Sequence, residues 1–73
     1  MMNEGLKMNV YQVELSVTDL KTRNSCIMLI IVNAKSEAQA CELGLDQGEE
    51  FVDYKHDLQV NGCTYLYPCE TIN

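Results

Sequence analysis

His56 is the only histidine in the chain, and it could act as a general base if a nucleophile lay within hydrogen-bond reach. A predicted turn at Asn61-Gly62 places His56 opposite Tyr67 on the neighbouring strand. In that register the nearest thiol, Cys63, lies about two pairs further along the same face, or roughly 10 Å away by the rise of a strand. This separation is too long for a Cys-His dyad, so the sequence predicts a structural histidine, no catalytic residue and no enzymatic activity.

Four cysteines could form disulfides or bind a metal. Their spacing lacks the C-x₂₋₄-C pattern of structural zinc sites, and three of them fall at interior positions, where a reduced cysteine packs as a small apolar side chain. The first residues contain no apolar run typical of a signal peptide. We therefore expect a cytoplasmic protein with reduced thiols, no metal and no cofactor, and disulfides or metal ligation remain alternatives. The cysteines are Cys26, Cys41, Cys63 and Cys69.

Three tyrosines cluster in the last third of the chain, and tyrosines on a sheet face can stack on nucleic-acid bases. Modules that bind nucleic acids in this way also carry basic residues that meet the phosphates. Here the neighbouring charges are mostly carboxylates, so we expect core or interface tyrosines and no direct binding of nucleic acid. The tyrosines are Tyr54, Tyr65 and Tyr67, and the carboxylates near them are Asp53, Asp57 and Glu70.

The formal net charge of -6 is concentrated in the second half of the chain. Residues 1–35 hold four cationic side chains and three carboxylates, whereas residues 36–73 hold one lysine and eight carboxylates. One interpretation is a solvated helix face that aids solubility. The other is an anionic surface that docks on a basic surface of another protein and imitates the spacing of phosphates, because an ordinary surface mixes both signs. The residues predicted to bind the partner are Glu42, Asp46, Glu49, Glu50, Asp53 and Asp57.

Two segments in the first half have the patterns of strands. Residues 10–18 alternate between apolar and polar side chains, as expected for a strand with one wet face. Residues 25–34 are apolar on both faces, which suits a central strand covered on both sides. One helix can cover only one face, so we expect Ile27, Leu29 and Ile31 on the other face to mediate self-association in a homodimer.

A helix is predicted to begin after Ser36, because Ser36 and Gln39 match a capping box. It should run from Glu37 to about residue 47 or 50. The expected core stripe is Ala38, Cys41 and Leu45, flanked by Ala40, Gly44 and Gly48. The small size of the glycines suggests a close approach to the sheet, and the alternative for Gly48 is a C-cap.

Residues 51–60 alternate again and precede Asn61-Gly62, the favoured pair for a type I′ hairpin. A two-residue turn would set Val60 opposite Cys63 and Leu58 opposite Tyr65, with Pro68 ending the last strand. The predicted fold is therefore α+β, of order ββαββ, with a four-stranded antiparallel sheet and one helix packed on one face. Residues 8–73 form this single domain after a flexible leader, residues 1–7, and Met8 is an alternative start. No segment is long and apolar enough to span a membrane.

These observations lead to a functional hypothesis without an enzyme. The chain is expected to be a small acidic protein-interaction module, such as a phage- or mobile-element-type inhibitor that docks on the nucleic-acid-binding site of a host protein. The alternative is a homodimeric structural or small-ligand-binding domain, or an accessory subunit of a larger enzyme.

Overall fold

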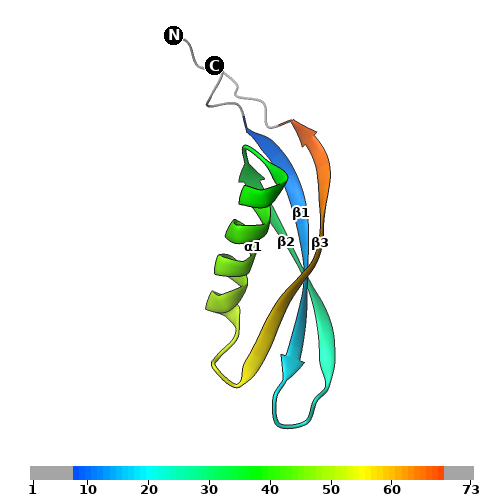
Figure 1. Cartoon of the computed structure of the whole chain (residues 1–73), viewed down its shortest axis with the longest axis vertical. Coiled ribbons are helices and arrows are strands. Elements are labelled where there is room, and N and C mark those ends of the chain that lie inside the picture. The colour runs from blue at the N-terminus through cyan, green and yellow to red at the C-terminus, as the bar shows by residue number, and fades with distance from the viewer. Residues whose placement is uncertain (1–7, 69–73) are drawn as a thin grey trace.

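Three strands and one helix make up the fold in the computed structural model, which describes residues 8–68. Strand β1 (Asn9–Asp19), strand β2 (Ser25–Ala34), helix α1 (Glu37–Phe51) and strand β3 (His56–Pro68) follow one another in that order. The strands form one antiparallel sheet in the order β2-β1-β3 (Figure 1). The predicted leader, residues 1–7, and the tail that includes Cys69 lie outside the described residues.

The α+β class is as predicted, but the prediction of a four-stranded ββαββ sheet is wrong. Residues 56–68 form one continuous strand along β1, and neither Asn61 nor Gly62 has the positive φ that a type I′ turn needs at both positions. His56 consequently pairs with Asp19 instead of Tyr67, and Leu58 pairs with Val17 instead of Tyr65.

A bulge absorbs the Asn-Gly pair inside β3. Gly62 lies opposite Glu14 and Val60 lies opposite Leu15, which leaves Asn61 as the extra residue. Its side-chain Nδ2 donates to Ser16 Oγ at 2.7 Å and to Glu14 Oε2 at 3.3 Å. Pairing along the whole of β1 satisfies more backbone groups than a short hairpin would, because the residues beyond this bulge pair with β1 except at a second bulge, Leu66.

The hairpin between β1 and β2 has the boundaries that the sequence pattern predicts to within a residue. Asp19 closes the loop, since its Oδ1 accepts hydrogen bonds from the backbone N–H groups of Lys21 (2.8 Å) and Thr22 (2.9 Å). Arg23 completes the turn in the left-handed region, with a φ of 67°. The prediction that β2 is the central strand is wrong, because β1 takes that place and β2 lies at one edge.

Helix α1 begins as predicted. The Ser36 Oγ accepts a hydrogen bond from the Gln39 N–H at 3.2 Å, while the Gln39 Oε1 accepts one from the Lys35 N–H at 2.7 Å. In a capping box the Gln39 side chain would accept from the N–H of the N-cap residue Ser36; here it accepts from the N–H of Lys35, one residue earlier. The helix continues through Gly48 to Phe51, with Val52 as its C-cap, so Gly48 is not the cap.

Close contact between α1 and the sheet depends on two glycines. Gly44 lies against Val13, where an added Cβ would be 2.7 Å from the valine Cβ and Cγ1. Gly48 lies against Leu15, where an added Cβ would be 2.5 Å from Cδ1. The predicted close approach is therefore confirmed, although Ala40, Gly44 and Gly48 are the buried stripe and Ala38 is exposed.

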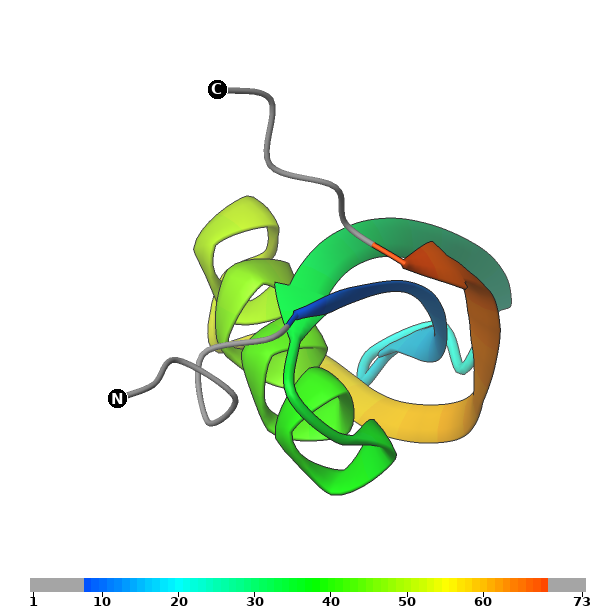
Figure 2. The same cartoon turned by 90° about the horizontal axis from the view of Figure 1, so that it is seen from above.

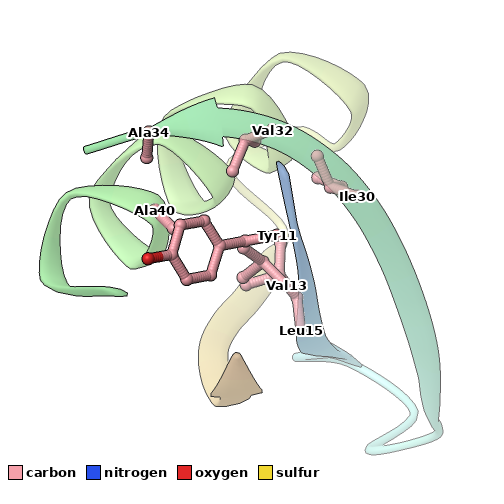
Figure 3. Close-up of a cluster of buried hydrophobic side chains, with 7 residues drawn as sticks. All are labelled: Tyr11, Val13, Leu15, Ile30, Val32, Ala34 and Ala40. Atoms are coloured by element: carbon pink, nitrogen blue, oxygen red, sulfur yellow. The ribbon is translucent and has the colours of Figure 1, made fainter. Parts of the chain in front are cut away.

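The core lies between α1 and one face of the sheet (Figure 3). Seen from above, the helix covers only that face of the twisted sheet (Figure 2). Val13 and Leu15 of the central strand are fully enclosed. The buried cluster drawn in Figure 3 has side chains from β1, β2 and α1, namely Tyr11, Val13, Leu15, Ile30, Val32, Ala34 and Ala40.

We predict that Gly44→Ala destabilises the fold more than Gly48→Ala, although the second contact is the shorter one. The branched Val13 side chain cannot turn away, so overpacking should cost about 1–3 kcal/mol and exceed the gain of about 1 kcal/mol in helix propensity. The Leu15 Cδ1 is the end of a flexible side chain and can move. Urea unfolding followed by circular dichroism would measure both variants. A Gly44→Ala variant as stable as Gly48→Ala would contradict this account.

Candidate functional site

His56 lies between two carboxylates at the start of β3. Its Nδ1 is 2.8 Å from Asp53 Oδ1, in the connection that follows α1, and its Nε2 is 3.7 Å from Asp19 Oδ2 at the end of β1. The Leu20 N–H also donates to the Lys55 carbonyl at 2.9 Å. These contacts join the α1–β3 connection to the β1–β2 hairpin.

Both carboxylates are held in their charged form. Hydrogen bonds from the backbone N–H groups of Thr22 and Lys21 lower the pKa of Asp19. The hydrogen bond with His56, followed by that from the Lys55 N–H, lowers the pKa of Asp53. Each carboxylate is stabilised by specific donors and not by burial, because both side chains are accessible to water.

His56, Asp19 and Asp53 line an open hollow of about 720 Å³ beside the loop between β1 and β2. Cys26, Met28, Phe51 and Val52 supply much of its apolar lining. Within the described residues, no hydrogen bond connects His56 to the Cys26 thiol. Nδ1 is within hydrogen-bond distance of Asp53, and no serine, threonine or cysteine side chain among the described residues is hydrogen-bonded to His56, so the imidazole has no nucleophile in reach to activate. This geometry favours a structural role for His56.

The thiols of Cys41 and Cys63 meet between α1 and β3. Burial, and then the neighbouring Cys41, raise the pKa of the Cys63 thiol to about 11. A thiol is reactive and binds metals as the thiolate, so Cys63 is poorly suited to either task at neutral pH. No group of three or more histidine, cysteine, aspartate or glutamate side chains among residues 8–68 is arranged to hold a metal ion.

The six predicted partner-binding carboxylates are all exposed, and the structure divides them into two groups. Glu42, Asp46 and Glu49 lie on the side of α1 that is opposite its buried stripe. Glu50 lies beside them in the last turn of the helix. Asp53 and Asp57 follow in the connection and at the start of β3.

A second hollow, of about 340 Å³, brings the end of the helix and the start of β3 together. Glu49, Asp53 and Asp57 all line it, and Tyr54, which is 86% exposed, lies among them. No lysine or arginine lines this hollow, but His56 does, and the Lys55 Nζ lies 5.9 Å from the centroid of the Tyr54 ring. The ion pairs found within residues 8–68 are those of His56 with Asp19 and Asp53. We call this hollow, together with the outward side of α1, the anionic face; its carboxylates are Glu42, Asp46, Glu49, Glu50, Asp53 and Asp57.

The residues predicted to mediate self-association lie on the opposite side of the molecule. Ile27, Leu29 and Ile31 alternate along β2 with the residues that face α1, and their exposed fractions are 55%, 55% and 53%. The neighbouring side chains of β1 on this face are polar, including Glu14 and Ser16. The apolar stripe is therefore confined to the edge strand.

Sequence reasoning missed the contacts around His56. The spacing of Asp53 and Lys55 is a signal for an Asx turn, because an aspartate oxygen commonly accepts the N–H two residues later, here at 3.0 Å. The contact with Asp19 has no such local signal. It depends on the register of β3 on β1, which the hairpin prediction had wrong.

Comparison with known proteins identifies no relative: no family model matches the chain, and no curated protein or solved structure is significantly similar to it. Helix α1, the one helix in the described part of the chain, is too short and too polar to cross a membrane.

We predict that the Asp53–His56 contact contributes to stability at neutral pH and not in strong acid. A carboxylate whose folded-state pKa lies below the ordinary 3.8 stabilises the fold above that pH, and the contribution disappears as the pH falls through the folded-state value. The midpoint of urea unfolding for Asp53→Asn should therefore lie below that of the wild type at neutral pH and approach it well below pH 3.8.

Asp46→Asn is the matched control, since Asp46 has no hydrogen-bond partner within the described residues. It should not show the same convergence. If the unfolding midpoints of Asp53→Asn and the wild type differ by the same amount at neutral pH and well below pH 3.8, the charge of Asp53 does not account for the loss of stability.

Proposed function

We propose that this chain is a non-enzymatic, cytoplasmic interaction module that binds a basic surface of another protein through its anionic face. The observation that carries the proposal is the hollow where Glu49, Asp53 and Asp57 converge around the exposed Tyr54 without a lysine or arginine in its lining.

The carboxylates of the anionic face favour a cationic partner. Neighbouring like charges on a helix repel by a few tenths of a kcal/mol per pair, and cationic side chains from a partner would remove that repulsion. The Tyr54 ring has the chain's own Lys55 Nζ at 5.9 Å from its centroid, and its 86% exposure leaves room for a guanidinium group to stack on it. Arginine side chains suit both contacts, because they form bidentate bonds with carboxylates and stack on aromatic rings.

Basic surfaces that normally hold nucleic-acid phosphates have this chemistry, so an inhibitor that occupies such a site is the form of the proposal that we favour. A concentrated negative field would also steer the encounter with such a partner. The free Cys26, Cys41 and Cys63 are consistent with a compartment in which thiols stay reduced.

The test uses fluorescently labelled nona-arginine as the probe and fluorescence anisotropy as the measurement. The double variant Glu49→Gln/Asp57→Asn should bind about five- to tenfold more weakly than the wild type, as expected for two exposed ion pairs. Binding should also weaken as added salt shortens the Debye length from about 10 Å to about 3 Å.

The matched control is Glu14→Gln/Glu37→Gln, which removes the same charge from positions outside the anionic face. Its affinity should stay close to that of the wild type. If both double variants lose the same affinity for nona-arginine, the binding depends on net charge alone. That result would contradict a defined binding site.

A further inference from the structure

Strand β2 forms an edge of the sheet that carries none of the usual protection against pairing. Its ten residues contain no charged side chain and no proline, and β1 is its one strand neighbour among the described residues. The other edge, β3, has two bulges, Asp57 near its start and Pro68 at its end. Charges, prolines and bulges are the features that keep edge strands from pairing with other chains. The two edges therefore differ in their capacity to accept a further strand.

The free backbone groups and the exposed side chains of β2 belong to the same residues. The Asp19 N–H donates to the Asn24 carbonyl at 2.8 Å, and bonded pairs alternate with non-bonded pairs along an antiparallel ladder. The even-numbered residues of β2 consequently bond to β1. The odd-numbered residues Ile27, Leu29 and Ile31 direct their N–H and C=O groups toward the free edge, and their side chains are half exposed.

We propose that β2 pairs with β2 of a second copy of this chain, antiparallel and about a two-fold axis at Leu29. In this register Leu29 lies opposite Leu29 of the second copy, and Ile27 lies opposite Ile31 of the second copy. The free backbone groups then form bonded pairs at the same positions, because all of these residues are odd-numbered. Two three-stranded sheets become one sheet of six strands.

The uncharged sequence of β2 makes this edge the place where a second copy fits. Two chains of net charge -6 repel each other, and the uncharged β2 is a seam at which no carboxylate meets another. A basic partner attracted by the anionic face would instead dock on the other side of the molecule. Stacking two sheets face to face would bury Glu14, whereas pairing at the edge leaves Glu14 in water.

Pairing of this kind closes on itself. A two-fold contact uses the unprotected edge of both copies, and the bulged β3 edges remain at the ends of the joined sheet. Both helices lie on the same side of that sheet, because antiparallel neighbours keep equivalent side chains on one face. The dimer would thus present two anionic faces in one direction. The pairing itself does not depend on the proposed function.

The first experiment measures the mass of the intact chain by sedimentation equilibrium from micromolar to millimolar concentration. We expect a concentration-dependent dimer of twice 8.3 kDa. Leu29→Lys should remain monomeric, because two lysines would face each other across the axis. The matched control, Thr64→Lys, adds the same charge to the same sheet face on β3, opposite Gln12, and should still dimerise. Circular dichroism would verify that both variants fold.

The second measurement is amide hydrogen exchange followed by NMR on the wild-type chain. The amides of Ile27, Leu29 and Ile31 should become protected as the concentration rises, while those of Met28, Ile30 and Val32 are protected throughout. A monomer at millimolar concentration, open-ended assemblies, or odd-numbered amides that exchange freely in the dimer would each overturn the proposal. The proposal would also be overturned if Leu29→Lys and Thr64→Lys weakened the dimer equally.

Discussion

The contact of Gly44 with Val13 sets the position of the helix, and much of the remaining architecture depends on it. A side chain at Gly44 would collide with a branched residue that is itself fully enclosed. Small residues at this position and one turn later bring α1 close enough to cover β1 together with the inward residues of β2. This close packing compensates for the weak intrinsic helix propensity of two glycines, because most helical stability in proteins comes from tertiary contacts.

The orientation of the helix has two consequences for the surface. Its buried stripe faces the sheet, so Glu42, Asp46 and Glu49 face water on the other side. A single helix covers a single face, so the outward stripe of β2 stays exposed. The charged surface and the apolar surface therefore lie on opposite sides of the domain, so the two proposed contacts do not overlap.

Strand β1 is the central strand of the sheet and sets the positions of β2 and β3. It pairs over nearly its whole length with both neighbours, and the bulge at Asn61 allows β3 to stay in register with it beyond Gly62. The same pairing brings His56 to Asp19, which connects the two loops at that end of the molecule. The hollow that joins Glu49 to Asp57 lies beside this connection, so the geometry of the anionic face depends on the register of β3.

Sequence patterns alone determined the first two strands, the capped start of the helix, the close approach of its glycines and the placement of negative charge. Each of these depends on alternation, capping or composition within a short window, where local physical chemistry dominates. Tertiary structure decided that Asn61-Gly62 forms a bulge and not a turn. In isolation the pair suits a tight turn, and the bulge is favoured only because it lets β3 pair along the length of β1. The edge position of β2, the contacts of His56 and the placement of Glu49 and Asp57 around one hollow were likewise decided by tertiary structure, since each involves residues that are distant in the chain or on separate elements.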